Sequence, residues 1–259
     1  MTVIPRFRRK SEEQRTGTMS LVDHLEELRH RIIVCMIAIA CGAVVGWVIY
    51  EPFKTLMLHP YTQYVLSLPP RSRPPAGQDL VFTGVLDPML VKIKIVMYVG
   101  LMVALPVLLY QLWAFIVPGL HDKEKKMAIP FIASSVVLFA LGGLVAFVTL
   151  PKALTFLLGF AGARVVPLIS FNQYIAFVVL VTIAFGVSFE LPILLVFLEI
   201  IGVLSSDRLR QWRRPAILGV AIFAAVITPS QDPFTMLAMM IPMLVFYEAS
   251  IIIGRMLKK

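Results

Sequence analysis

Two places in this sequence hold carboxylates beside or inside long apolar runs, where they could bind a cation or carry a proton. The first is the stretch from Ser20 to Ile33, SLVDHLEELRHRII, in which three acidic residues come directly before an apolar run. The second is Glu190, which lies well inside another such run. A carboxylate at the centre of a bilayer costs at least about 2.5 kcal/mol, so it must face protein or a watery cavity. Glu190 is therefore a candidate functional residue; the alternative is a protonated Glu190 bonded to a neighbouring helix.

The N-terminal carboxylates have an ordinary explanation as well. Four apolar residues from Leu21 to Ile32 recur at intervals of four, three and four, which is the spacing of one helix face. Charged residues cover the rest of the turn, and Glu27 and Arg31 are spaced for an i,i+4 ion pair worth about 0.3–0.5 kcal/mol. Periodicity alone therefore favours a solvated amphipathic helix over a binding site.

Catalytic chemistry is not supported by the spacing of nucleophiles and histidines. The closest match to a nucleophile elbow, GVSFE at 186–190, lacks the second glycine. The four histidines lie outside the apolar runs and include no HExxH pair, so no zinc site and no buried general base is predicted. We expect no enzyme activity, no metal and no cofactor.

The composition identifies the environment of these groups. Hydrophobic residues make up 59% of the 259 residues and charged residues only 15%, against about 25% charged in a soluble domain. A helix needs about 20 apolar residues to cross the hydrocarbon core. The sequence therefore predicts an all-α integral membrane protein, folded as one membrane domain over 1–259. Six transmembrane helices are expected near 32–50, 95–117, 128–150, 171–203, 215–227 and 234–253.

Several residues predict how these spans deviate from straight helices. Pro106, Pro192 and Pro242 each remove a backbone donor and should kink their spans. Two glycines at 142–143 should allow close helix approach. The two C-terminal spans are short, since the 13 residues from Pro215 to Ile227 make only about 20 Å of helix. A kinked, curved bundle is expected.

Orientation follows from the basic residues, which stay on the cytoplasmic side of a membrane. Seventeen of the 24 Lys and Arg residues lie in four segments on one side, at 1–31, 118–127, 202–214 and 255–259. Both termini are therefore expected in the cytoplasm, with a cytoplasmic tail at 254–259. The large outer loop, 51–90, has the proline-rich centre LPPRSRPPAG and is expected to be extended. Topology accounts for the net charge of +9, so nucleic acid is not expected to bind.

Five segments together carry a family resemblance. They are HLEELRHR before the first span, LYQLWAFIVPGL closing the second, the Glu124-Lys125-Lys126 turn, AFGVSFELP in the fourth, and ITP followed by Asp232 and IPM. In this order they resemble the TatC family, the six-helix core of the twin-arginine protein translocase, over about residues 20 to 255.

The resemblance implies a receptor of the cytoplasmic (inner) membrane that binds twin-arginine signal peptides of folded proteins. It further implies assembly with the single-span partners TatA and TatB, association with further copies of itself, and export driven by the proton motive force. By position, the implied signal-peptide residues are Glu27, Arg29, Glu124, Gln111 and Phe115. Paired guanidinium groups need carboxylates where water is partly excluded, which Glu27 and Glu124 would supply.

The resemblance also implies roles elsewhere in the chain. Glu190 matches the intramembrane carboxylate of the family, Pro60 and Asp232 match outer-side functional positions, and Thr228 and Met236 fall where partners dock. The methionine replaces a frequent polar residue, which is a departure from the family pattern. The alternative function is a proton-coupled small-solute secondary transporter that uses Glu190, although the inverted repeats of such carriers are not evident.

Overall fold

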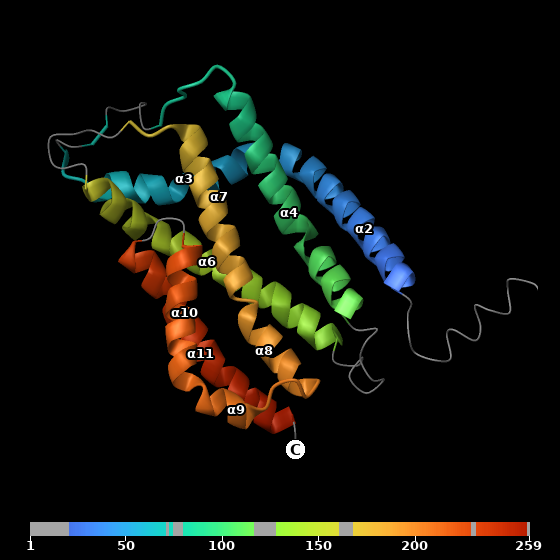
Figure 1. The fold of residues 1–259 in the computed structure, drawn as a ribbon. Coiled ribbons are helices and arrows are strands. Elements are labelled where there is room, and N and C mark those ends of the chain that lie inside the picture. Colours follow the sequence, from blue (N-terminus) through green and yellow to red (C-terminus); the bar gives the residue numbers. More distant parts are fainter. Residues whose placement is uncertain are drawn as a thin grey trace, which may run out of the picture.

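The computed structural model describes residues 21–70, 73–74, 80–116, 128–160, 168–228 and 232–257, and within them it contains helices and no named strand (Figure 1). The helices are α2 (Leu21–Val48), α3 (Tyr50–Ser67), α4 (Asp87–Ile116), α6 (Ala128–Gly159), α7 (Phe171–Ser188), α8 (Leu191–Ile200), α9 (Ser206–Gln211), α10 (Arg213–Ile227) and α11 (Pro233–Leu257).

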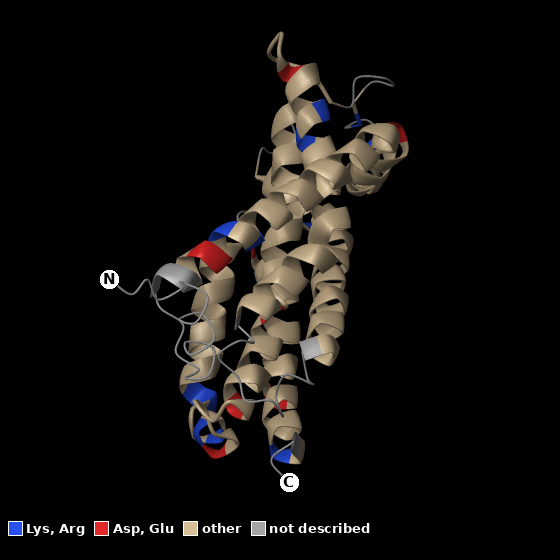
Figure 2. Ribbon diagram, turned by 90° about the vertical axis from the view of Figure 1, so that its right-hand side faces the viewer, with Lys and Arg blue, Asp and Glu red and all other residues tan. Residues whose placement is uncertain are grey.

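Five helical segments in the described part of the chain are long and apolar enough to cross a membrane. They are His24–Val48, Asp87–Phe115, Ile129–Gly159, Phe171–Ile200 and Pro233–Met256. Large apolar side chains such as Val44, Val148 and Ile252 are exposed on these helices, as a lipid-facing surface requires. Figure 2 shows Lys, Arg, Asp and Glu gathered toward helix ends, with long uncharged stretches between them. The prediction of an all-α membrane protein is confirmed.

Two helices extend beyond the spans expected from the sequence. The second helix begins at Asp87 rather than near 95, and the third continues to Gly159 rather than 150. Both extensions carry polar residues that a hydropathy criterion excludes, although the helical backbone continues through them. The fifth expected span corresponds to α10, whose 15 residues are fewer than the long helices have.

The outer segment 51–90, expected as an extended loop, is helical in its first half. Helix α3 runs there across the direction of its neighbours (Figure 1). Its buried residues Met57, Tyr61 and Tyr64 recur with helical spacing, a pattern that the prolines and polar residues of the segment obscured. The hydroxyl of Tyr174 on α7 donates to the carbonyl of Met57 (2.8 Å) and attaches α3 to the bundle. Half of the proline-rich centre, residues 71–72 and 75–77, lies outside the described residues.

The fourth span, in which Pro192 predicted a kink, is broken into two helices. Helix α7 ends at Ser188 and α8 begins at Leu191, with Glu190 as its N-cap and Pro192 in its first turn. Proline is well suited to a first turn because its missing N–H is not required there. The span ends at Ile200 rather than 203, because Gly202 adopts a positive φ of 78° that terminates the helix. Pro106 and Pro242, in contrast, lie inside continuous helices.

Glycines set two close helix contacts. A Cβ atom at Gly42 of α2 would lie 2.5 Å from the carbonyl oxygen of Gly100 on α4. A Cβ atom at Gly142 of α6 would lie 2.6 Å from the carbonyl oxygen of Phe185 on α7. Both distances are shorter than any side chain tolerates, so the helices touch through their backbones. The close approach predicted for the 142–143 glycines is confirmed, and the α2–α4 contact positions the site described next.

Candidate functional site

Several predicted site residues lie close together on helices α2 and α4. They lie where the first turns of α2 pack beside the last turns of α4. Arg31 of α2 forms an ion pair with Glu27 one turn earlier through its Nη2 atom. Its Nη1 atom donates to Oε1 of Gln111 on α4 (3.2 Å). Arg31 thus bridges Glu27, which is four residues away in the sequence, and Gln111, which is 80 residues away. Since the guanidinium is planar and has donors on both sides, it suits such a bridge.

An aromatic contact lies on the same pair of helices. The ring of His24 on α2 stacks on the ring of Phe115 on α4, with centroids 4.4 Å apart and an interplanar angle of 21°. Phe115 follows Gln111 by four residues, so the two lie on one face of α4. The site therefore combines a carboxylate, an amide and an aromatic ring, all on rigid helices.

The polar atoms of this site are not fully engaged. The side chains of Arg31 and Glu27 are only 18% and 22% exposed. Oε2 of Glu27 and Nε of Arg31 are buried and have no hydrogen-bond partner among the residues that the structure describes. An unmet acceptor on a partly buried carboxylate favours a cationic donor, because the charge is poorly solvated there.

The sequence-predicted site residues are thus partly assembled. Glu27, Gln111 and Phe115 converge, whereas the side chain of Arg29 is exposed. Glu124 lies outside the described residues. Sequence reasoning missed Arg31 and His24 as members of the site. The i,i+4 spacing pointed to the Glu27–Arg31 pair, but no local signal linked it to Gln111.

Glu190 lies at the break between α7 and α8 rather than in a continuous helix. Its Oε1 atom is buried without a hydrogen-bond partner in the described part of the chain, while Ser135 of α6 interacts with the carboxylate. The hydroxyl of Ser135 also accepts a hydrogen bond from Nε1 of Trp113 on α4 (3.0 Å). The break therefore delivers a carboxylate to a small polar contact between helices.

The two residues predicted to act on the outer side, Asp232 and Pro60, are both buried. Asp232 is fully buried and accepts hydrogen bonds from the backbone N–H of Thr235 (2.8 Å) and from its hydroxyl. It is followed by Pro233 at the first position of α11, so it caps that helix as an aspartate before proline often does. Pro60 is buried inside α3.

Loss of this cap should destabilise the protein. We expect Asp232→Ala to lower the free energy of unfolding by about 1 kcal/mol, because the first turn of α11 loses its acceptor. Asp232→Ser keeps a hydroxyl oxygen at the cap and should recover most of the loss. Thermal unfolding of the purified protein in detergent measures both variants. Equal destabilisation by serine and alanine would show that capping is not the role of this side chain.

The predicted partner-docking residues lie at the α10–α11 connection. Thr228 is only 1% exposed and its hydroxyl donates to the carbonyl of Ala224 (2.6 Å). Met236 is partly buried against the main hydrophobic core. Neither side chain is fully exposed. We therefore expect Thr228 to affect docking through the conformation of the α10–α11 hairpin and not through direct contact.

Two polar networks were not predicted from the sequence. At the start of α4, Asp87 accepts from the backbone of Gly84 (2.7 Å) and from Asn172 of α7 (2.9 Å), which in turn accepts from Lys94 (2.5 Å). This network joins the start of α4 to the start of α7.

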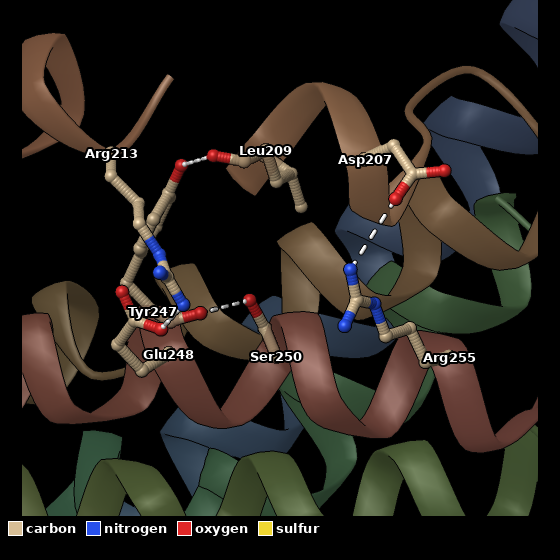
Figure 3. A network of polar contacts seen from close by, with 7 residues as sticks. All are labelled: Asp207, Leu209, Arg213, Tyr247, Glu248, Ser250 and Arg255. Carbon is tan, nitrogen blue, oxygen red and sulfur yellow. Dashed lines mark hydrogen bonds and ion pairs between the residues drawn. The ribbon is translucent and has the colours of Figure 1, made fainter. Parts of the chain in front are cut away.

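The second network joins α9, α10 and α11 (Figure 3). Arg213 pairs with Glu248 (2.5 Å), Arg255 pairs with Asp207 (3.3 Å), and the hydroxyl of Tyr247 donates to the carbonyl of Leu209 (2.7 Å). No group of three or more potential metal ligands occurs among the described residues.

Comparison with known proteins places these features in a family. The family model described as Sec-independent protein translocase protein (TatC) matches residues 23–242. The Sec-independent protein translocase protein TatC of Frankia casuarinae is 41% identical over 248 residues, covering 95% of this chain and 68% of that protein. The corresponding protein of Aquifex aeolicus is 36% identical, with 92% and 95% covered.

Two solved structures are also similar to this chain. A crystal structure described as that of the twin-arginine translocase receptor TatC has a TM-score of 0.70 and 35% sequence identity, covering 91% of this chain and 100% of the other. A second, of the same receptor in DDM, has a TM-score of 0.71 at 36% identity, covering 89% and 99%. The matched region includes Glu27, Gln111 and Glu190 alike.

Proposed function

The chain belongs to the TatC family of Sec-independent protein translocase proteins, and on that premise we propose that it binds the twin-arginine signal peptides of folded export substrates. The observation that carries the proposal is the α2–α4 site, in which Arg31 joins the Glu27 carboxylate to Gln111 and one oxygen of Glu27 is still able to accept. Phe115 completes the site, and Arg29 and Glu124 are its proposed further members.

The chemistry of the site suits an arginine pair. A guanidinium is always charged and offers planar donors that match a carboxylate. At 4 Å such a pair gains about 4 kcal/mol at an effective dielectric of 20, before desolvation, compared with about 1 kcal/mol in bulk water. Partial burial of Glu27 therefore makes the carboxylate a better receptor for arginine than an exposed acid.

The proposed topology places this site in the cytoplasm. We assign α10 as a sixth, short span beside the five long candidates, with both termini cytoplasmic in the cytoplasmic membrane. The excess of Lys and Arg at 1–31, 202–214 and 255–259 supports this orientation. A span of 15 residues is shorter than the hydrocarbon core and requires local thinning of the bilayer.

The α10–α11 hairpin is the proposed docking surface for TatA- and TatB-type partners, near Thr228 and Met236. It leaves Ile222, Val226 and Leu237 exposed, as a helix partner in the bilayer requires. Further copies of the chain are proposed to join the complex, and export is proposed to use the proton motive force. Pro60 and Asp232 are the proposed sensitive positions on the outer side.

A binding measurement tests the proposed function. The full-length protein is purified in detergent and titrated with a fluorescent peptide that carries two adjacent arginines, and with a counterpart that carries two lysines. We expect binding of the arginine peptide and at least tenfold weaker binding of the lysine peptide, because lysine lacks the bidentate donor geometry. Equal affinity for the two peptides would contradict the proposal.

Glu190 should act after binding. We expect Glu190→Leu to leave signal-peptide affinity unchanged while export falls, because the carboxylate lies at the α7–α8 break and not at the α2–α4 site. Glu190→Gln, which keeps the polar shape without the charge, separates loss of charge from loss of polarity. Peptide crosslinking and export are measured in parallel. Loss of crosslinking in either variant would place Glu190 in the first binding step.

The same residue was the basis of the alternative function, a proton-coupled transporter of small solutes. Membership of the TatC family favours translocation of proteins over that alternative. Uptake of a small solute by proteoliposomes that contain only this chain would be needed to revive it.

A further inference from the structure

The carboxylate proposed to receive the signal peptide is already occupied by an arginine of the same chain. We propose that Arg31 is an internal competitor that lowers the affinity of the site for its peptide ligand, an inference that rests on the proposed function. In this view the peptide binds by exchange: one of its guanidinium groups replaces that of Arg31 on Glu27.

The geometry supports an exchange. Arg31 holds Glu27 with Nη2 and Gln111 with Nη1, so one planar group satisfies two acceptors on different helices. An incoming arginine has the same donors in the same plane and can reproduce both bonds. Nε of Arg31 and Oε2 of Glu27 have no hydrogen-bond partner in the described part of the structure. The internal pair is thus incompletely bonded, which leaves a further contact for a better-placed ligand to make.

Arg31 is also able to leave. It lies about three turns into α2. Its side chain is 18% exposed, and its long stem can carry the guanidinium toward water. The ring of Phe115 at the same site is likewise covered by a side chain of α2, His24. Both contacts come from one helix and can be released together without moving the α2–α4 backbone contact at Gly42.

Competition by Arg31 lowers the affinity for every ligand of this site by the same factor, because the free energy needed to displace Arg31 does not depend on the ligand that replaces it. When an arginine of the peptide replaces Arg31, the two hydrogen bonds are kept. When a lysine replaces it, a single ammonium cannot span Glu27 and Gln111 in the same way, and one bond is lost. The preference for guanidinium geometry therefore comes from Glu27 and Gln111, whereas Arg31 sets how tightly any ligand binds.

The test compares affinities of the twin-arginine and twin-lysine peptides for Arg31 variants of the full-length protein. We expect Arg31→Gln to bind the arginine peptide about twofold to fivefold more tightly, since no partly exposed ion pair must first be broken. The gain for the lysine peptide should be of the same size, so that the preference for arginine stays unchanged. Arg31→Lys should lie between the wild type and Arg31→Gln.

Two controls separate this effect from changes in charge or folding. Arg213→Gln removes the same charge from the Arg213–Glu248 pair on other helices and should leave both affinities unchanged. In the double variant Glu27→Gln/Arg31→Gln the gain should disappear, because it runs through Glu27.

The outcomes distinguish the inference from the proposed function. If the wild type prefers the arginine peptide and Glu27→Gln loses that preference, the proposed function holds. Under that condition, weaker or unchanged binding of the arginine peptide by Arg31→Gln, or a gain for only one of the two peptides, overturns the inference and leaves Arg31 as a positioning residue. If the wild type shows no preference for arginine, the proposed function itself fails and the inference falls with it.

Discussion

Glu27→Gln is expected to abolish export of substrates with twin-arginine signal peptides while the protein still accumulates in the membrane. The substitution keeps the size and the hydrogen-bonding shape of the side chain but removes the charge. Hydrogen bonds to charged groups contribute about 1.5–3 kcal/mol each, so peptide affinity should fall at least tenfold. Export of a twin-arginine reporter and immunodetection of the variant in membranes measure both parts of the result.

Glu26→Gln is the matched control for that experiment. Glu26 precedes Glu27 on α2, has the same chemistry and is exposed. Neutralising it changes the net charge equally but leaves the ion pair with Arg31 intact. Export should continue in this variant. Normal export by Glu27→Gln, or an equal loss in Glu26→Gln, would contradict a specific role for the Glu27 carboxylate. Glu124→Gln is proposed to behave like Glu27→Gln.

The second large effect is expected from a single methyl group far from the peptide. In Gly42→Ala the new Cβ atom would lie 2.5 Å from the backbone oxygen of Gly100, which cannot rotate away. Helices α2 and α4 must separate or tilt, at a cost of about 1–3 kcal/mol. Because Arg31 joins Glu27 to Gln111 across the same helix pair, we expect both a lower unfolding temperature and weaker binding of the twin-arginine peptide.

Gly159→Ala is the matched control for the methyl group. Gly159 lies at the end of α6, and a Cβ atom there would meet no atom within 4 Å. Alanine also has the higher helix propensity, so stability should stay constant or rise slightly. Unfolding temperature and peptide affinity are measured for both variants. If Gly42→Ala resembles Gly159→Ala, the α2–α4 backbone contact does not control the site.

The membrane class and the places of most helices were predictable because they depend on local composition. A long apolar run can satisfy its backbone in lipid only as a helix, whatever surrounds it. The break in the fourth span was predictable for the same reason, since Pro192 acts on its own turn of helix. Helix α3 was missed because its apolar residues make one buried face rather than a continuous run.

The site shows where local reasoning stops. Sequence alone determined the residue types, their order and the i,i+4 spacing of Glu27 and Arg31, and by resemblance it marked Gln111 and Phe115. Only the tertiary structure decided that Arg31 binds Glu27 and Gln111 together. That contact joins positions 80 residues apart, and it exists because glycines let α2 and α4 approach to backbone contact. Such proximity depends on packing between helices, which no periodicity within one helix records.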